Sequence, residues 1–306
     1  MDPRRLLTFR TVAHERSFSR AAIELSLSQP SVSHQISLLE TEVGVRLLER
    51  GRGGLRLTAA GAVLLEHADQ IAWRLELADR QIATVAGERL GALRVGSFPT
   101  AMATFVPATI RSLREADPDL RVLLTEVTPS TLESRLLSGE FDLALNYQDT
   151  AVERREIEGA ERIDLFCDTF LIGLPPDHRL AAGSGPLKLA QLAKDDWILP
   201  SNEGFLAEAC REAGFEPRVI ATTPDPVATH GLIARGLGIG WIPGLLAEGQ
   251  RDIVIRPVKG KIPTRDVYAL LPPGDRHPLV TKLIAALKDT ARDFSSLGAK
   301  GPRGNR

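Results

Sequence analysis

The sequence predicts an α/β protein with a small all-α helix-turn-helix unit at its N-terminus. Three observations lead to this fold class. Short helical periodicities fill the first 43 residues, a long proline-free helical stretch follows, and strand and helix patterns then alternate through most of the remaining chain. The chain has 306 residues, which fits two or three folding units better than a single core.

The composition is that of a soluble globular protein, with 43% hydrophobic and 25% charged residues. No apolar run is long enough to cross a bilayer, and charges interrupt the N-terminal segment, which excludes a secretory signal. We therefore expect a cytoplasmic protein without a membrane partner. Its two cysteines, Cys167 and Cys210, lack a zinc-binding spacing, so we expect no metal site and interpret them as small apolar residues, with a redox-sensing pair as the alternative.

The charge is unevenly distributed. The formal net charge of the whole chain is −1, yet residues 1–58 contain nine arginines against six acidic residues, a local net charge of +3. A small basic N-terminal region followed by an acidic remainder is typical of a DNA-binding protein with a separate control domain.

Three short amphipathic helices are expected in the first 44 residues. Ser17 can cap the second helix and Ser28 the third, whose first turn tolerates Pro30 because a missing N–H costs little there. The third helix should end near Gly44. A turn of three to four residues before the last of three helices is typical of a helix-turn-helix. The inward faces are formed by Leu6, Phe9, Val12 and Ala13, by Phe18, Ala21, Ala22 and Leu25, and by Val32, Ile36, Leu39 and Val43.

The outward face of the third helix carries short polar side chains where an ordinary solvated helix would carry Glu and Lys. Hydroxyls and amides of this size can pair with base edges in the major groove of DNA. A solvated face of low charge is the alternative. The residues on this face are Gln29, Ser31, Ser33, His34, Gln35 and Ser37.

A glycine-rich turn at 51–54 lies between two short extended segments and predicts a β-hairpin. A hairpin after a helix-turn-helix is a wing, and we expect Arg50, Arg52 and Arg56 to contact phosphates there, which supplies affinity rather than sequence choice. An arginine-bearing surface loop without this role is the alternative.

The stretch from Ala21 to Gly61, AAIELSLSQPSVSHQISLLETEVGVRLLERGRGGLRLTAAG, resembles the DNA-binding domain of the LysR-type transcriptional regulators. The shared motifs are the paired alanines, Ser-Gln-Pro-Ser-Val-Ser, the Leu-Glu pair, Leu-Leu-Glu-Arg and Leu-Thr-x-Ala-Gly. The resemblance implies that the start of the third helix touches bases through Gln29, Pro30, Ser33 and His34. His34 stands where that family varies, so we expect it to influence which DNA sequence is read.

A long helix is expected from Thr58, which can cap it, to about residue 86. Its apolar residues recur at alternating steps of four and three, the pattern of a two-stranded coiled coil, and its other faces are polar. A helix packed only on its own domain is the alternative. The resemblance implies that this helix pairs two subunits and that the dimers form a homotetramer. The dimerisation seam is Leu64, Ala68, Ile71, Leu75, Ala78, Ile82 and Val85.

Strand and helix patterns alternate after residue 92, which predicts an α/β domain with mostly parallel sheets. In such sheets ligands bind at the carboxyl ends of strands, beside helix N-termini. Ordinary helix capping is the alternative for the hydroxyl-rich loops at these ends. Expected helices lie at 101–115, 131–137, 205–213, 227–234 and 279–287, and expected strands at 93–95, 121–127, 141–145, 197–199, 219–220 and 239–242.

The segments RVGSFPT, SGEFDLAL, LPPDHRLA and GLIARGLGIGWIP resemble the effector-binding domain of the same family. The resemblance implies two lobes like those of a periplasmic binding protein, joined by two crossover strands, the second near Val267–Leu271. A small-molecule effector would lie between the lobes. No arginine stands out in the expected loops to clamp a carboxylate. The resemblance and the loop positions give Ser97, Thr100, Thr128, Ser201 and Asn202 as effector-binding residues.

The expected domains are therefore a winged helix-turn-helix at 1–58, a linker helix at 59–90, a two-lobed effector domain at 91–294 and a disordered tail at 295–306. Lobe I is expected at about 91–162 and 268–294, and lobe II at about 163–267. The expected partners are double-stranded promoter DNA with an interrupted dyad, the effector, further copies of the chain, and RNA polymerase.

An enzyme and a solute-binding transport protein are the two alternative classes. An enzyme is disfavoured because the sequence has no metal-binding His-Glu pattern, phosphate loop or nucleophile elbow, so we expect neither catalysis nor a cofactor. The glycines at 236, 238 and 240 precede an expected strand, whereas a nucleotide-binding fingerprint follows one. A solute-binding transport protein would match the second half alone, but it would lack a DNA-binding head.

Overall fold

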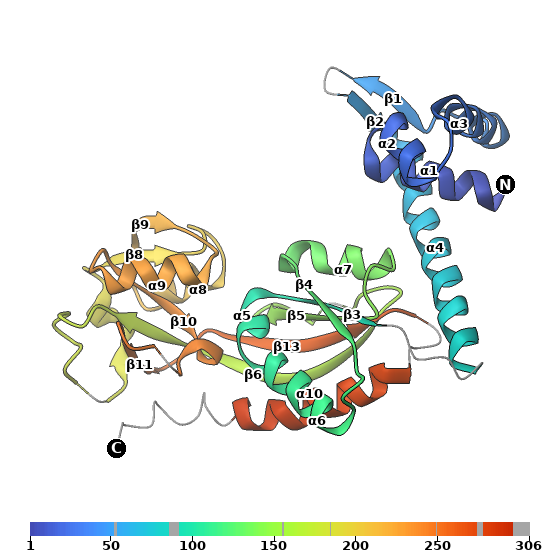
Figure 1. Cartoon of the computed structure of the whole chain (residues 1–306). Helices are drawn as coiled ribbons and strands as arrows, with labels where there is room; N and C mark the ends of the chain where they lie inside the picture. Colours follow the sequence, from blue (N-terminus) through green and yellow to red (C-terminus); the bar gives the residue numbers. More distant parts are fainter. Residues whose placement is uncertain are drawn as a thin grey trace. The chain divides into compact units, whose positions relative to one another are not determined.

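The computed structural model describes residues 1–51, 54–85, 92–154, 156–183, 185–248, 250–273 and 278–295. Two units can be distinguished (Figure 1). The first comprises residues 1–91 together with 134–141, and the second comprises the remainder of the chain. Each has its own buried core.

The first unit begins with α1 (Pro3–Glu15), α2 (Phe18–Glu24) and α3 (Gln29–Val43). The expected caps are confirmed. The Ser17 and Ser28 hydroxyls each accept a backbone N–H three residues later, and α3 ends at Gly44 in the left-handed region, with φ 76°. The inward faces of the three helices meet in one core, in which Phe9, Val12 and Leu39 are fully buried.

The wing and the linker helix follow directly. Strands β1 (Leu48–Gly51) and β2 (Gly54–Leu57) pair antiparallel, which confirms the predicted hairpin. Helix α4 then runs from Ala59 to Val85, and its first turn is capped by the Thr58 hydroxyl, which accepts the Gly61 N–H at 3.0 Å.

The second unit is built on one continuous sheet whose strand order is β4-β3-β5-β13-β6-β10-β8-β9, with β11 also paired to β6. Strands β4, β3 and β5 are parallel and form lobe I, while β10, β8 and β9 are parallel and form lobe II. The bounds are β3 (Leu93–Ser97), β4 (Val122–Glu126), β5 (Leu143–Asp149), β6 (Glu161–Leu174), β8 (Asp196–Leu199), β9 (Arg218–Thr222), β10 (Ile239–Pro243), β11 (Val254–Arg256) and β13 (Thr264–Leu271).

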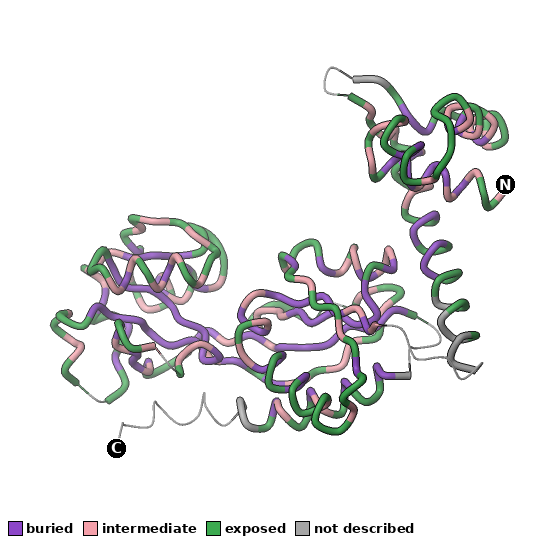
Figure 2. The backbone as a smooth tube through the Cα atoms, in the orientation of Figure 1, coloured by how far each residue is buried: buried purple, intermediate pink, exposed green. Residues whose placement is uncertain are grey.

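Strands β6 and β13 are the two connections between the lobes. They pair antiparallel with each other over the whole of β13 and over residues 161–169 of β6, and they run side by side across the unit (Figure 1). The sheet is therefore mixed: the expected parallel pairs lie in the lobes, and antiparallel pairs lie at its centre. Buried backbone follows these central strands and also the neighbouring strands of both lobes (Figure 2).

Helices cover the sheet in both lobes. Helix α10 lies beside α6 and packs on β6 (Figure 1). The continuous helix expected at 101–115 is instead two helices, because Thr104 leaves helical geometry with φ −125° and ψ −96°. The remaining elements are α5 (Pro99–Ala103), α6 (Phe105–Ala116), α7 (Pro129–Leu137), α8 (Phe205–Glu212), α9 (Pro226–Ala234), α10 (Pro278–Ser295), the short strands β7 (Leu187–Lys188) and β12 (Val258–Lys259), and the 3-10 helices η1 (Leu189–Leu192) and η2 (Gly244–Leu246). Of the expected tail at 295–306, Ser295 ends α10 and the rest lies outside the described residues.

Candidate DNA-reading head and effector site

The start of α3 presents its polar side chains to solvent. Gln29, Pro30 and His34 are exposed, and Ser33 is half-buried. These are the four residues expected to contact bases, and they lie within the first two turns of one helix. Because successive turns of a helix repeat every 3.6 residues, Pro30, Ser33 and His34 share one side of α3.

Gln35 has a different role from the one its position on the polar face suggested. Its Oε1 accepts a hydrogen bond of 2.6 Å from the Thr8 hydroxyl on α1. The amide is therefore held between two helices of the head, and it fixes the orientation of α3 instead of reading a base.

The recognition helix is tied to the wing by one carboxylate. Glu40, near the end of α3, accepts the backbone N–H groups of Leu47 and Leu48 at 2.8 and 3.2 Å. Hydrogen bonds to an ionised acceptor are stronger than those between neutral groups. Glu40 therefore fixes where β1 begins relative to α3.

The wing is in turn tied to the linker helix. The Leu47 carbonyl accepts the Thr58 N–H at 3.0 Å, and the Thr58 hydroxyl donates to the Arg46 carbonyl at 2.7 Å. Gly61 faces this joint: a Cβ on Gly61 would lie 2.0 Å from the Leu47 carbonyl oxygen. Only glycine fits at this close approach, which explains the Leu-Thr-x-Ala-Gly segment in physical terms.

Helix α1 is joined to α4 by a buried carboxylate. Asp69 is 5% exposed, and its Oδ1 lies 2.7 Å from both Arg10 Nε and His14 Nε2. The sequence pattern placed Asp69 on a polar face of the linker helix. The structure shows that this face is covered by α1 at this point.

The expected dimerisation seam divides into two parts. The two residues nearest the head are covered within the single chain: Leu64 packs against the core of the head, and Ala68 is buried. Ile71, Leu75, Ala78 and Ile82 are exposed in the single chain, Leu75 and Ile82 by 49% and 67%. An exposed apolar row on a long helix is what a coiled-coil partner would cover.

The wing arginines are only partly described. Arg56 is exposed on β2. The backbone of Arg50 lies in β1 but its side chain is not described, and Arg52 lies outside the described residues.

In the second unit the carboxyl ends of three strands of lobe I meet. Ser97 ends β3 and is fully buried, and its carbonyl accepts the Val127 N–H that follows β4. On β5, the Asn146 side chain donates to the Pro129 carbonyl at 3.2 Å. Ser97, Thr100 and Thr128 therefore lie at one edge of the lobe I sheet, with Thr100 buried and Thr128 exposed.

A buried arginine reaches this edge from a distant part of the sequence. Arg265, on β13, is 3% exposed and donates through Nη2 to the Thr100 hydroxyl at 2.8 Å. Its Nε and Nη2 also lie 3.0 and 2.8 Å from Asp168 Oδ2 on β6. The two crossover strands are thus joined by an ion pair that is almost fully removed from water.

Asp168 continues this chain of contacts into lobe II. Its Oδ1 accepts the Leu245 N–H at 3.0 Å, directly after β10. Burial raises the pKa of the Asp168 carboxyl, and the Arg265 guanidinium and the backbone N–H groups of Leu245 and Gly244 oppose that shift. We call Thr100, Asp168, Arg265 and the Gly244–Leu245 backbone the lobe junction, because they connect strand ends of both lobes.

Three aromatic rings surround the guanidinium at the lobe junction. The Cζ of Arg265 lies 4.4 Å from the ring centre of Tyr147, 5.2 Å from Phe98 and 5.3 Å from Phe170. Phe98 and Tyr147 also pack edge to face, with ring centres 5.0 Å apart. Cation–π contacts of this kind strengthen when water is excluded.

Ser201 and Asn202 follow β8 in lobe II and are exposed. The Ser201 hydroxyl accepts the Glu203 N–H at 3.2 Å, and the Asn202 carbonyl accepts a hydrogen bond from Arg211 of α8 at 2.8 Å. These hydrogen bonds of Ser201 and Asn202 are thus made within lobe II, to Arg211 of α8 and to Glu203 shortly before that helix.

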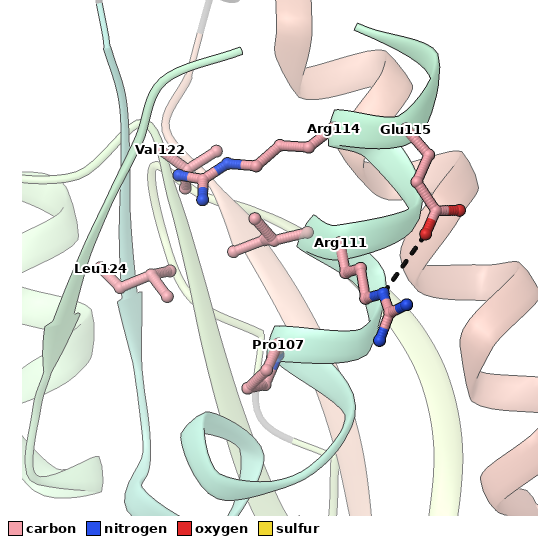
Figure 3. A pocket seen from close by; sticks show the side chains of 7 residues that line it. Pro107, Arg111, Arg114, Glu115, Val122 and Leu124 are labelled. Carbon is pink, nitrogen blue, oxygen red and sulfur yellow. Dashed lines mark hydrogen bonds and ion pairs between the residues drawn. The ribbon is translucent and has the colours of Figure 1, made fainter. Parts of the chain in front are cut away.

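An open groove of about 510 Å³ lies elsewhere on lobe I, between α6 and β4 (Figure 3). Arg114 extends over it toward Val122, and Arg111 pairs with Glu115 at 3.3 Å along its helical side. Val122 is the first residue of β4, so the groove lies at the amino end of that strand, opposite the edge that carries Ser97 and Thr128. Its floor is apolar, formed by Pro107, Ile110, Val122 and Leu124.

The comparisons with known proteins decide the family. A family model described as "LysR substrate binding domain" matches residues 86–292, and one described as "Bacterial regulatory helix-turn-helix protein, lysR family" matches residues 3–62. The chain belongs to the LysR family of transcriptional regulators. It has the helix-turn-helix DNA-binding domain and the effector-binding domain of that family, whose members are regulators of transcription.

Relatives of this LysR-type regulator match most of its length. It is 31% identical to the HTH-type transcriptional regulator AlsR of Bacillus subtilis over 79% of this chain and 80% of AlsR. It is 29% identical to the Hca operon transcriptional activator HcaR of Escherichia coli over 94% of this chain and 98% of HcaR.

Solved structures of the family match the fold. A full-length OxyR variant from Pseudomonas aeruginosa has 25% identity and a TM-score of 0.71, with 95% of each chain covered. Full-length CbnR in complex with its target DNA has 25% identity and a TM-score of 0.66, covering 95% of this chain and 100% of CbnR.

The regulator's thiols are held in their protonated form. Cys210 is buried and Cys167 is exposed, and neither forms a disulfide. Burial raises the pKa of the Cys210 thiol to about 12. Partial desolvation of the Cys167 sulfur, together with the nearby Asp266 and Asp168 carboxylates, raises the pKa of Cys167 although the residue is exposed at the surface. Since the thiolate is the reactive form, these settings favour the interpretation as unreactive residues over a redox-sensing pair.

Within the described residues, no cluster of three His, Cys, Asp or Glu side chains is arranged to hold a metal ion. None of the described helices combines the length and apolar character needed to span a membrane.

The sequence missed Arg265 and Asp168 as candidate site residues of this LysR-type regulator. Strand and helix patterns point to ligand-binding loops at strand ends, whereas Arg265 lies inside a strand. The only signal available was a charged residue at an inward position of a strand that is otherwise apolar, where a charge is costly unless it is paired.

Proposed function

We propose that this LysR-type regulator binds an interrupted dyad in promoter DNA as a homodimer or homotetramer, and that a small-molecule effector at the lobe junction modulates that binding. Effector binding would shift the spacing of the DNA-reading heads, alter the bending of the promoter and thereby change recruitment of RNA polymerase. A ligand acts in this way only if its affinity differs between the two conformations. We expect no catalysis, no metal and no cofactor other than the effector, and a cytoplasmic location.

The main support for this proposal is that some polar side chains of the recognition helix are exposed, while others are held by contacts inside the head. Gln29 and His34 are exposed at the start of α3, whereas Gln35 and Glu40 are held by contacts inside the head. A solvated helix without a reading function would not need such fixed orientation. DNA readers must hold a few side chains at set positions against base edges.

The test compares two variants by fluorescence anisotropy over a range of salt concentrations. His34→Ala should change which base is preferred at one position of each half-site, by about 1–3 kcal/mol. Arg56→Ala should weaken binding to all sequences alike and lower the salt slope by about one unit. Equal behaviour of the two variants would contradict the proposal.

The proposed assembly depends on the exposed row of α4. Leu75→Asn places a polar group at the centre of the seam and should lower the mass measured by light scattering. Glu66→Asn, on an exposed polar position of the same helix, is the matched control and should leave the mass unchanged. An unchanged mass for Leu75→Asn would contradict a coiled-coil dimer.

A further inference from the structure

Helix α1 contacts the recognition helix on one side and the linker helix on the other. The Thr8 hydroxyl donates to Gln35 Oε1 of α3 at 2.6 Å, and Arg10 Nε donates to Asp69 Oδ1 of α4 at 2.7 Å. Thr8 and Arg10 are two residues apart, so their side chains leave α1 in directions about 200° apart. The polar contacts of α1 therefore connect the helix expected to read DNA with the helix that carries the dimerisation seam.

Asp69 holds two successive turns of α1. Arg10 and His14 are four residues apart and share one face of that helix, and both lie 2.7 Å from the same carboxylate oxygen. Apolar packing is non-directional, whereas charge-assisted hydrogen bonds fix a geometry. A carboxylate that contacts two turns of α1 therefore fixes both the position of α1 along α4 and the angle at which the two helices cross. We call Arg10, His14 and Asp69 the α1–α4 joint.

A second attachment lies at the start of α4. The Thr58 N–H donates to the Leu47 carbonyl and the Thr58 hydroxyl to the Arg46 carbonyl. Gly61 faces the same Leu47 carbonyl, and Asp69 lies eight residues further on, which is about 12 Å along the helix. Two attachments at this separation fix the direction in which α4 leaves the head, because a rotation about the first would break the second.

The α1–α4 joint also lies where the dimerisation seam becomes exposed. Ala68 is buried and Ile71 is exposed, so Asp69 stands between the covered and the exposed residues of the seam. In a dimer, the direction of each α4 from its head sets the separation and the relative rotation of the two recognition helices. One additional base pair between two half-sites moves them about 3.4 Å apart and turns them by about 35°. Heads that are fixed on α4 can follow such a change only by losing contacts with DNA.

We propose that the α1–α4 joint determines which half-site spacing this LysR-type regulator accepts, as distinct from which bases it reads. This inference rests on the proposed function, because it requires two heads on one dyad. Residues at the start of α3 select the bases of each half-site. Asp69 is a positioning residue that acts through Arg10 and His14 and selects the length of the spacer between the half-sites. An ion pair that only stabilised the fold would leave that length unchanged.

The experiment is a selection of bound duplexes from a pool with about 40 base pairs of random sequence, long enough for an interrupted dyad, followed by sequencing. The full-length native protein and Asp69→Ala are compared. We expect the native protein to favour one spacer length at least about tenfold over lengths one base pair shorter or longer, a difference of about 1.4 kcal/mol. Asp69→Ala should lower that ratio at least about threefold and leave the base preferences of the half-sites unchanged.

Two further variants keep the test decisive. The Arg10 and His14 side chains are 34% and 50% exposed, so water can hydrate both after Asp69→Ala, and this variant should fold. Arg10→Met leaves His14 beside Asp69, so it should fold even more readily, and it should lower the spacer ratio at least about twofold. Glu66→Ala is the matched control, because it removes a carboxylate from an exposed position of the same helix, and it should keep the native spacer distribution.

Native spacer selectivity in both Asp69→Ala and Arg10→Met would overturn the inference, as would the same loss of selectivity in Glu66→Ala. Changed base preferences in Asp69→Ala, or a lower mass in light scattering, would also overturn it, since the α1–α4 joint would then act on base reading or on assembly. Failure of the proposed function is distinct from these outcomes: a native protein that enriches no dyad overturns the proposed function. A dyad enriched with one spacer distribution by all the proteins overturns only this inference.

Discussion

The DNA-reading head and the lobe junction are both built by polar contacts, but the contacts differ in their reach along the chain. In the head, Glu40 bonds to residues seven and eight positions away, and Thr58 to one twelve positions away. At the lobe junction, Arg265 contacts residues 97 and 165 positions away. The head is thus assembled from neighbouring segments, and the lobe junction from strands of both halves of the effector unit.

This difference has an energetic consequence. The Glu40 and Thr58 side chains of the head are half-buried, so water can replace part of a lost contact. The Arg265–Asp168 pair is almost fully buried, so the loss of one partner leaves the other without compensation. The substitutions below should therefore cost most at the lobe junction and less in the head.

The largest effect is expected for Arg265→Met. Removal of one member of a buried ion pair costs about 3–5 kcal/mol of unfolding free energy, measured by urea denaturation, whereas the double variant with Asp168→Leu should recover most of that loss. Because burial then places the folded pKa of Asp168 further above its unfolded value, the folded state binds the proton more tightly. The penalty in the single variant should therefore shrink as the pH falls through that folded pKa.

Arg292→Met is the control for this comparison. Arg292 pairs with Asp289 at 3.2 Å, but both side chains are largely exposed on α10. Loss of a surface pair changes stability by less than about 1 kcal/mol. Equal losses for Arg265→Met and Arg292→Met would show that burial does not distinguish the two sites.

A smaller loss is expected for Gly61→Ala in the head. The new methyl group would meet the Leu47 carbonyl oxygen and force the wing and α4 apart, at a cost of about 2–3 kcal/mol. Gly231→Ala in α9 is the matched control, since nothing lies within 4 Å of a Cβ there, and alanine favours a helix by about 1 kcal/mol. Thermal denaturation of the two variants should move in opposite directions, and destabilisation by both would contradict the steric explanation.

Glu40→Ala should cost less again, about 1–2 kcal/mol, because the N–H groups of Leu47 and Leu48 lose a charged acceptor that is itself half-buried. Its DNA affinity should fall further than its stability alone explains, since the wing loses its fixed position relative to α3. Glu40→Gln keeps an acceptor oxygen and should retain most of both properties. A Glu40→Ala variant with unchanged DNA affinity in anisotropy would show that the wing is positioned by other contacts.

The contrast between the two regions also explains what the sequence could predict. The residues expected to contact bases lie on one helix, and its caps at Ser28 and Gly44 follow from local chemistry. Spacing alone therefore located α3, the hairpin and α4. The lobe junction could not be predicted in this way, because no local pattern reveals that residues 100, 168 and 265 meet.

Two smaller errors have different origins. The helix expected at 101–115 is broken at Thr104 for a local reason: in a continuous helix Pro107 could not donate to the Ala103 carbonyl and its ring would clash with it, whereas Pro107 fits in the first turn of α6. The first crossover strand, β6, was not located because its 14 residues mix polar and apolar side chains without strict alternation. Strand β6 pairs with β13 over its first part and with β10 over its last part. Which of its side chains are buried is therefore set by tertiary contacts.

The smallest effect is expected for the cysteines. Because burial raises the pKa of Cys210 to about 12, and that of Cys167 is also raised, few thiolates are present at neutral pH. Ellman's reagent should modify Cys210 only after unfolding, and Cys167 more slowly than a free cysteine at the same pH. Brief exposure to peroxide should leave DNA affinity unchanged, and a shift in that affinity would restore the redox-sensing alternative.

DNA reading by α3 is tested most directly by a capture of genomic fragments with the purified full-length protein and with His34→Ala, followed by sequencing of the bound DNA. We expect the native protein to enrich a few fragments bearing an interrupted dyad, and His34→Ala to change the preferred base at matching positions of the two half-sites. Enrichment without a dyad, or identical sequence preferences for the two proteins, would contradict base reading by this helix.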